Sequence, residues 1–139
     1  MKLITAVIKP FKIDEVKDAL KNVGVQGMTI SEVVGFGRQS GHTEVYRGAE
    51  YTIDFVPKRK IEVLCDDDAA GRIASVIEHV ARTGTIGDGK LWIVDVAGVV
   101  RLRTGEDGRH ILHRAAHSGA ESARDRNRLF IAKIFPSNG

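Results

Sequence analysis

The order in which hydrophobic patterns follow one another limits the fold of this chain more than any other feature. Leu3–Ile8 is a short apolar run rich in β-branched residues, which predicts a buried strand. The next apolar residues recur at spacings of three and four and end at a glycine, which is typical of an amphipathic helix: Ile13, Val16, Leu20, Val23 and then Gly24. A second strand is predicted at Met28–Gly37.

The same order returns after a polar interval. A strand is predicted at Arg59–Cys65, and Asp66–Asp68 then supply acidic residues that cap and charge-match the start of a helix. That helix ends near Gly84 and is marked by the apolar residues Ile73, Val76, Ile77 and Val80. Further strands are predicted at Leu91–Val96 and Val99–Arg103.

Two strand–helix–strand units on one sheet predict an α+β fold. The expected arrangement is the ferredoxin-like split βαβ (βαββαβ), with both helices on one face of the sheet. The opposite face then needs another cover, and self-association of the chain is the simplest one. The length of 139 residues suits a single domain, which we place at residues 1–112.

The connection between the second and third of these strands is long and polar. It contains "GRQSGHTEVYRGAEYT" (Gly37–Thr52), with Tyr46 and Tyr51 five residues apart. At roughly 20 residues it far exceeds an ordinary hairpin loop of about 2–5 residues, and loops of that length are usually functional or disordered. We therefore predict that this loop is a contact surface; Tyr46 itself receives no role.

The net positive charge belongs to the end of the chain. Five of the 21 Lys and Arg residues and two of the 18 Asp and Glu residues lie from His113 onward, so positions 1–112 carry 16 of each. Overall charge therefore does not favour a nucleic-acid partner. Residues 113–139 are predicted to be a separate basic tail, with an apolar cluster at Leu129–Phe135.

The beginning of the chain and its cysteine content indicate a cytoplasmic protein. Cys65 is the one cysteine, so no internal disulfide can form. The starting apolar run is interrupted by Lys9 and Pro10, unlike a signal peptide, and no segment approaches the ~20 apolar residues of a membrane span.

A glycine-rich segment, "GTIGDGKL" (Gly84–Leu91), has part of a Walker phosphate-loop pattern. Leu91 stands where that motif needs a hydroxyl, and here a helix leads in and a strand leads out, the reverse of a phosphate loop. We therefore reject a Walker NTPase. The glycine amides and Lys90 still suit an anion-binding nest, while a plain turn with a solvated Lys90 remains the alternative.

Two arginines close to the predicted domain end add to this picture. Arg101 and Arg103 alternate on a predicted strand, so both guanidinium groups would leave the same face and suit a polyphosphate. A solvated strand face is the alternative. No nucleophile–base pair or Cys/His metal spacing occurs, and the scattered histidines are expected at the surface: His42, His79, His110, His113 and His117.

Two segments, "YRGAEY" (Tyr46–Tyr51) and "TGTIGDGKLWI" (Thr83–Ile93), resemble the two signatures of the PII nitrogen-regulatory signalling family. The segments "MKLITAVIKPFK", "VQGMT" and "GFGRQSGHTEVYRGAEY" are similar to that family too, and the resemblance runs from Met1 to about Glu106. It implies a homotrimer of ferredoxin-like subunits that binds ATP or ADP in clefts between subunits and, with MgATP, 2-oxoglutarate. The long loop, called the T-loop (about residues 37–55), would dock into partners and regulate them.

The resemblance also implies site residues. The nucleotide would be held by Thr29, Gly35, Arg38, Glu62, Leu64, Gly87, Asp88, Gly89, Lys90, Arg101 and Arg103. Thr29, Glu62 and Leu64 would line the adenine and ribose side, and the two arginines would reach across the subunit boundary.

The remaining implied contacts lie in or beside the T-loop. They would bind 2-oxoglutarate through Gly37, Gln39, Gly41 and Lys58. Gln39 would also contact Mg²⁺, since a neutral amide can complete the shell of a hard cation. Lys58 would pair with the distal carboxylate. Tyr51 would be the modified position, uridylylated in many members and adenylylated in actinobacterial ones.

The resemblance further implies partners, with no catalytic residues and no enzymatic activity. Ammonium transporters and nucleotidyltransferases of glutamine synthetase control are the family's commonest targets, so membrane contact would come only through a transporter and no nucleic acid is expected. The chain departs from the family at Ser40, where lysine is common, at Leu91, and from about Asp107 onward.

Two other functions are alternatives to a signalling protein. An RNA-binding module shares this architecture but needs exposed aromatic residues on the central strands, whereas the predicted strands are mainly aliphatic apart from Trp92. A nucleotide-hydrolysing enzyme that depends on Lys90 is the third hypothesis.

Overall fold

The computed structural model describes residues 1–37, 42–46, 49–53 and 55–112 of the 139-residue chain. The predicted site residues Arg38, Gln39 and Gly41, the variant position Ser40 and the predicted tail 113–139 lie outside the described residues.

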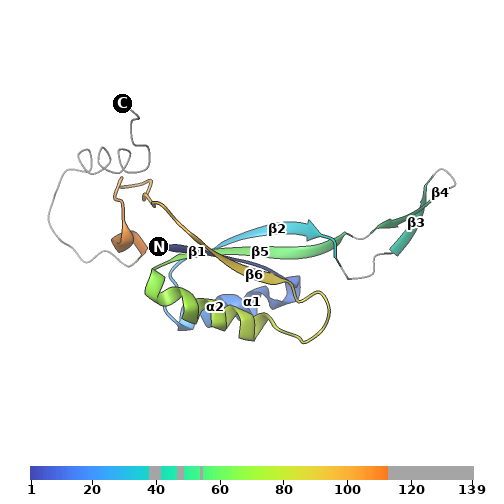
Figure 1. The fold of residues 1–139 in the computed structure, drawn as a ribbon, viewed down its shortest axis with the longest axis horizontal. Coiled ribbons are helices and arrows are strands. Elements are labelled where there is room, and N and C mark those ends of the chain that lie inside the picture. The colour runs from blue at the N-terminus through green and yellow to red at the C-terminus, as the bar shows by residue number, and fades with distance from the viewer. Residues whose placement is uncertain (38–41, 47–48, 54, 113–139) are drawn as a thin grey trace, which may run out of the picture.

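A four-stranded antiparallel sheet forms the centre of the molecule (Figure 1). Its order is β2-β5-β1-β6, where the strands are β1 (Lys2–Ile8), β2 (Thr29–Gly35), β5 (Val56–Cys65) and β6 (Lys90–Asp95). β1, the first strand in sequence, thus lies between β5 and β6. Its Ile4 is paired to Val63 of β5 on one side and to Ile93 of β6 on the other. This is the interleaved order of the ferredoxin-like fold, so the predicted α+β class is confirmed.

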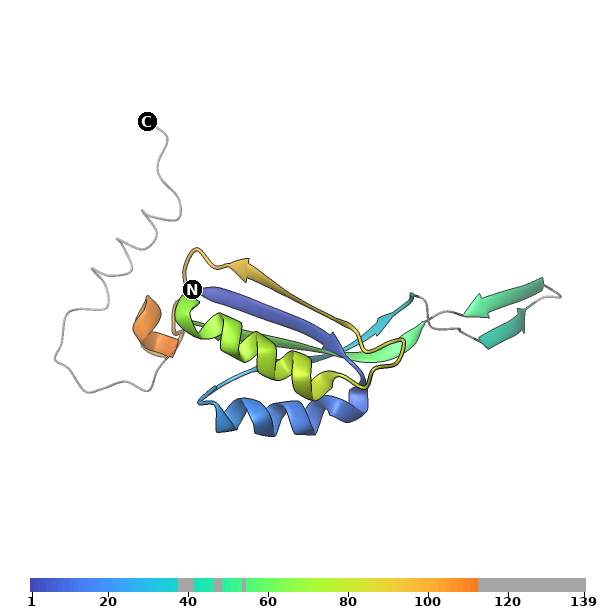
Figure 2. The same ribbon diagram turned by 60° about the horizontal axis from the view of Figure 1, so that its bottom comes forward.

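Both α-helices lie on one face of this sheet, as Figures 1 and 2 show. A short 3-10 turn, η1 (Pro10–Lys12), leads into α1 (Ile13–Asn22), and α2 (Asp67–Ala81) begins after Asp66. The two acidic residues in the first turn of α2 match the positive end of the helix dipole, as predicted. Within the part of the chain that the structure describes, no helix is long and apolar enough to cross a bilayer.

The hydrophobic core fills the space between the sheet and these helices. Alternate residues of the two central strands point into it, and apolar positions of both helices meet them: Ile4, Ala6, Ile8, Ile61, Val63, Cys65, Val16, Leu20, Ile73 and Ile77. Since strand side chains alternate, this spacing of two is what a sheet with one covered face requires. Burial also raises the pKa of the Cys65 thiol.

The opposite face of the sheet presents a mixed apolar and polar surface. Leu3 pairs with Leu64 and Val94 across the strands, and the next row on that face joins Thr5 to Glu62 and Trp92. Leu64, Trp92 and Val94 keep 40%, 45% and 45% of their surface exposed. We call this surface, the rows of Leu3 and Thr5 with their strand partners, the open sheet face.

The long polar connection contains regular structure that was not predicted from the sequence. It forms a two-stranded antiparallel hairpin, β3 (His42–Tyr46) with β4 (Ala49–Ile53), which projects away from the sheet in Figure 1. Tyr51 pairs with Glu44 in its register. Both strands are rich in β-branched and aromatic residues, which favour an extended backbone even in a polar segment.

The predicted strand Val99–Arg103 is wrong. An isolated bridge between Val100 and Asp107 occurs there instead, and the chain turns back between them. The turn is closed by hydrogen bonds from Arg101 N to Glu106 O (2.8 Å) and from Gly105 N to Arg101 O (2.8 Å). Gly105 has a φ of +70°, which glycine adopts without steric cost and which interrupts a strand. The chain then ends its described part in a 3-10 turn, η2 (Arg109–Leu112).

Candidate functional site

The glycine-rich connection between α2 and β6, residues 82–89, is the centre of the candidate site, and we call it the glycine loop. A helix ends before it at Ala81 and a strand begins after it at Lys90, so the inverted context that argued against a Walker motif is confirmed. Its backbone is unusual because Gly84, Gly87 and Gly89 all have positive φ.

Gly89 brings this loop into close contact with the central strand. A Cβ atom placed on Gly89, whose φ is +101°, would lie 1.7 Å from the carbonyl oxygen of Val7. Only a residue without a side chain allows the two backbones to approach this closely. The end of the glycine loop is therefore fixed against β1.

Asp88 closes the loop from within. Its carboxylate accepts hydrogen bonds from the backbone N–H groups of Thr83 and Gly84, both at 2.8 Å, and from the Thr83 hydroxyl. The Thr83 hydroxyl is the main cause of a lowered Asp88 pKa, with both backbone N–H groups and Lys9 contributing. The Asp88 side chain is thus occupied with the loop itself, which leaves its backbone N–H as the group that suits an anion.

Lys9, at the end of β1, also reaches this loop. Its Nζ lies 2.8 Å from Thr83 Oγ1, 2.5 Å from Thr85 Oγ1 and 3.1 Å from Asp88 Oδ1. Neither Lys9 nor Thr83 was predicted from the sequence as a site residue. The sequence gives little sign of this contact, because a lysine before a proline does not indicate which distant loop its side chain will face.

A pocket of about 750 Å³ opens beside the glycine loop, and we call it the glycine-loop pocket. It brings together many of the predicted phosphate and 2-oxoglutarate contacts, and it is lined by Val7, Gly35, Phe36, Gly37, Lys58, Ile86, Gly87, Gly89, Lys90 and Trp92. These residues come from β1, the two sides of the T-loop base, the glycine loop and β6. Two lysines in one glycine-lined pocket give it a positive potential that suits an anion.

Lys58 is the more enclosed of the two lysines. Only 8% of its surface is exposed, and its Nζ donates to the Gly87 carbonyl oxygen. Burial lowers the pKa of Lys58, and the charge of Lys9 lowers it further. A buried ammonium group that donates to a neutral carbonyl gains from an added carboxylate or phosphate, since charged groups in such a setting need compensation.

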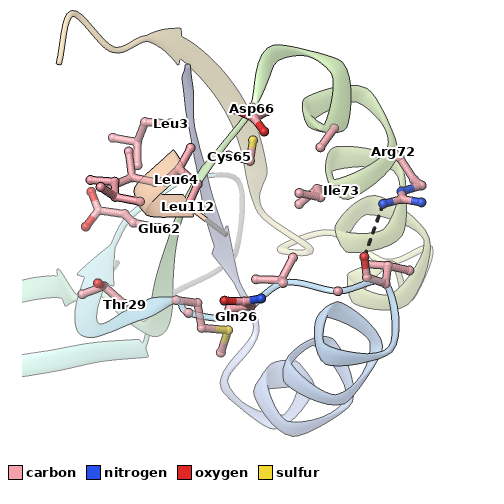
Figure 3. A pocket seen from close by; sticks show the side chains of 17 residues that line it. Leu3, Gln26, Thr29, Glu62, Leu64, Cys65, Asp66, Arg72, Ile73 and Leu112 are labelled. Atoms are coloured by element: carbon pink, nitrogen blue, oxygen red, sulfur yellow. Dashed lines mark hydrogen bonds between the residues drawn. The ribbon is translucent and has the colours of Figure 1, made fainter. Parts of the chain in front are cut away.

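A second pocket, of about 710 Å³, lies at the other end of the sheet (Figure 3), and we call it the strand-end pocket. It brings together the three predicted adenine-side residues Thr29, Glu62 and Leu64. Thr29 and Glu62 are direct partners in the β2–β5 register. Figure 3 also shows Leu112 of η2 beside Leu64 and Leu3. Leu112 was missed as a lining residue because nothing local in the sequence indicates where η2 folds back.

The two predicted arginines are not brought into either of these pockets. Arg101 Nη1 lies 2.7 Å from Glu106 Oε2, and its Nη2 donates to the Ile111 carbonyl oxygen at 3.0 Å. Leu102 and Arg103 are exposed in the turn that follows. The two guanidinium groups therefore do not share a strand face as the alternation suggested, because the backbone turns at this point.

The sheet order, the two helices on one face and the long insertion between β2 and β5 define a ferredoxin-like α+β protein with an anion-suited loop before its last strand. The family model described as "Nitrogen regulatory protein P-II" matches residues 1–106. This chain belongs to the P-II family, as the resemblance predicted, which assigns it a role in nitrogen signalling.

Comparisons with individual relatives agree with this assignment. It is 57% identical over 108 residues to the nitrogen regulatory protein P-II of Rhizobium meliloti (strain 1021), which covers 78% of this chain and 96% of the relative. It is 58% identical over 107 residues to nitrogen regulatory protein P-II 1 of Escherichia coli (strain K12), which covers 77% and 96%. The nitrogen regulatory protein P-II of Klebsiella oxytoca matches with the same identity and coverage.

The close approach at Gly89 predicts the cost of a side chain there. Gly89→Ala forces the glycine loop away from β1 and should lower the free energy of unfolding by about 3 kcal/mol, the sum of overpacking and backbone strain. Gly84→Ala is the matched control, because Gly84 also has positive φ (+81°) but no atom within 4 Å of its Cβ position; its expected cost is about 1 kcal/mol. Urea unfolding at one protein concentration measures both, and equal losses would contradict the close contact.

The lowered pKa of Asp88 predicts a pH dependence of stability. Its contribution is fully present above the unfolded-state pKa of about 4 and is lost as the pH falls through the lower folded-state pKa. The stability difference between wild type and Asp88→Asn should therefore be largest near neutral pH and shrink in acid. Urea unfolding across this pH range measures it. Asp18→Asn, at an exposed position of α1 beyond its first turn, is the control. A difference for Asp88→Asn that does not change with pH would refute the effect.

Proposed function

We propose that this protein is a non-enzymatic, ligand-gated signalling regulator that binds ATP or ADP and, with MgATP, 2-oxoglutarate. The observation that carries the proposal is the glycine-loop pocket, where Lys58 and Lys90 face a loop of positive-φ glycines. Backbone N–H groups and two cations form a donor set that fits the phosphates of a nucleotide. Bound MgATP would supply a divalent cation to which the carboxylate and keto oxygens of a 2-oxo acid can bind.

The phosphate and base contacts divide between the two pockets. The phosphates would lie at Gly87, the Asp88 backbone, Gly89 and Lys90, and the adenine and ribose at Thr29, Glu62 and Leu64 of a neighbouring subunit. Arg101 and Arg103 would contribute from across the subunit boundary. The separation of the two pockets within one chain supports this division, because β1 and β5 hold their residues in different rows of the sheet.

Lys58 would pair with the distal carboxylate of 2-oxoglutarate. Its burial and its neutral hydrogen-bond partner support this role. Gly37, Gln39 and Gly41 would complete the site, with Gln39 on the Mg²⁺ ion. Since MgATP would create part of this site, the two ligands would bind with positive coupling.

The conformation of the T-loop would depend on which ligands are bound. Gly35, Phe36 and Gly37 line the glycine-loop pocket where the chain enters the T-loop, and Lys58 lines it where the chain has left it. Phe36 and Phe55 join the two sides of the loop base in an edge-to-face contact with ring centroids 6.3 Å apart. A ligand in this pocket would therefore act on both ends of the T-loop at once.

The conformation of the T-loop would determine which partner proteins it binds and regulates. We propose ammonium transporters and nucleotidyltransferases of glutamine synthetase control as partners, in a cytoplasmic protein that meets a membrane only through a transporter. Uridylylation or adenylylation at Tyr51 would add bulk and negative charge to the hairpin and block docking. The two central strands present no aromatic residue on the open sheet face among the described residues, which does not favour the alternative of base stacking by RNA.

A titration tests the ligand sites. Calorimetry should show 2-oxoglutarate binding only when Mg²⁺ and ATP are present. Lys90→Met should weaken ATP binding by about tenfold or more, the value of a charge-assisted hydrogen bond. Lys58→Met should remove 2-oxoglutarate binding and leave ATP bound, while Lys17→Met on α1 should change neither. Binding of 2-oxoglutarate equally well without nucleotide, or a failure to bind adenine nucleotides, would refute the proposal.

The open sheet face supports the homotrimer that the resemblance implies. Its exposed Leu64, Trp92 and Val94 form a continuous surface whose burial between subunits would be favourable. A second subunit would also bring the strand-end pocket of one chain near the glycine-loop pocket of another.

Light scattering after size-exclusion chromatography tests this assembly. The wild type should have about three times the chain mass of 15.2 kDa. Trp92→Glu should dissociate the trimer, because it places a charge among the apolar residues of the open sheet face. Phe11→Glu is the control, since Phe11 is exposed in η1 on the helical side of the sheet. A monomeric wild type would contradict the assembly.

A further inference from the structure

Lys9 has contacts that neither the fold nor the proposed ligand contacts explain. It follows β1 directly, and only 14% of its side chain is exposed. Within the described part of the chain, the hydrogen-bond and ion-pair partners of its side chain all belong to the glycine loop, more than seventy residues later: Thr83, Thr85 and Asp88. A partly buried lysine that directs its three donors at one loop connects that loop to the end of the central strand.

The same loop contains an electrostatic conflict. Asp88 lies between Gly87 and Gly89, which line the glycine-loop pocket, yet its carboxylate is negative where a phosphate would bind nearby. The loop needs this carboxylate, because it accepts hydrogen bonds from the N–H groups of Thr83 and Gly84 and so closes the loop. A compensating cation is therefore required, and Lys9 is in ion-pair contact with Asp88.

Lys9 makes this contact from outside the pocket. Lys58 and Lys90 line the glycine-loop pocket, whereas Lys9, Thr83 and Asp88 do not. The Lys9 ammonium group is directed at oxygen atoms of the loop, so it can support the loop without touching a ligand. The positive charge of Lys9 also lowers the pKa of Lys58.

We propose that Lys9 is a positioning residue for phosphate binding. It neutralises Asp88 and holds the glycine loop closed, so that the backbone N–H groups near Gly87 and Gly89 converge on the pocket. This inference rests on the proposed nucleotide binding. It assigns the loop two kinds of cation: Lys58 and Lys90 face the ligand, and Lys9 faces the loop.

The roles of Lys9 and Asp88 must then be coupled. Without Lys9, the Asp88 carboxylate is an uncompensated anion beside the phosphates. The substitution Asp88→Asn keeps a side-chain carbonyl oxygen for the Thr83 and Gly84 N–H groups but removes the charge. Removing the carboxylate charge should therefore restore part of the affinity that loss of Lys9 removes, which independent contributions would not do.

A double-mutant cycle on the full chain tests this coupling with ATP and adenosine as ligands. Lys9→Met should weaken ATP binding by about tenfold, with adenosine binding little changed, and Lys9→Arg should restore binding to within about threefold of wild type. The double variant Lys9→Met/Asp88→Asn should bind ATP at least about threefold tighter than Lys9→Met alone. Lys17→Met is the lysine control.

Other outcomes separate the hypotheses. Thermal melts identify a variant that has lost its fold; the cycle is then repeated with Lys9→Gln, which keeps donors for the threonines and removes the charge. If the wild type binds ATP and Lys9→Met binds it equally well, or if the losses in the double variant multiply, the positioning role is wrong. If the wild type binds no adenine nucleotide, the proposed function itself fails.

Discussion

The contact between the Gly89 backbone and the Val7 carbonyl is the constraint on which the candidate site depends. β1 is one of the two central strands and is hydrogen-bonded to β5 and β6, so a loop fixed against its end is fixed relative to the whole sheet. The glycine loop therefore gains a defined shape without being part of a helix or strand. Its anion-suited amides are held in place before any ligand arrives, which reduces the entropy lost on binding.

Opposite charges are distributed around this loop in two layers. Lys58 and Lys90 line the glycine-loop pocket, while the Asp88 carboxylate is turned to the loop backbone and paired with Lys9. The arrangement resolves a general conflict in anion sites, where the groups that shape a loop also carry charge. In the same pocket, the base of the T-loop supplies Phe36 and Gly37, so a site built for an anion adjoins the segment whose hairpin projects away from the sheet in Figure 1.

Much of the fold was predictable because its signals are local. The apolar spacing at Val16 and Leu20 predicted α1, and the β-branched run at Leu3–Ile8 predicted β1. The strand predicted at Val99–Arg103 failed because alternation alone does not show that a partner strand exists, and Gly105 turns the chain back. The hairpin β3–β4 was missed because its strands pair with each other, outside the four-stranded sheet, and their sequence is largely polar.

In the site, the glycine loop, its lysine at position 90 and the family signatures could be identified from the sequence, because each lies in one continuous segment. The folded chain was needed to see that Lys9 and Lys58 reach the same loop, that Thr29 pairs with Glu62, and that Arg101 contacts Glu106. These contacts depend on sheet order, strand register and backbone reversal, and residues distant in the chain show no local sign of such relations.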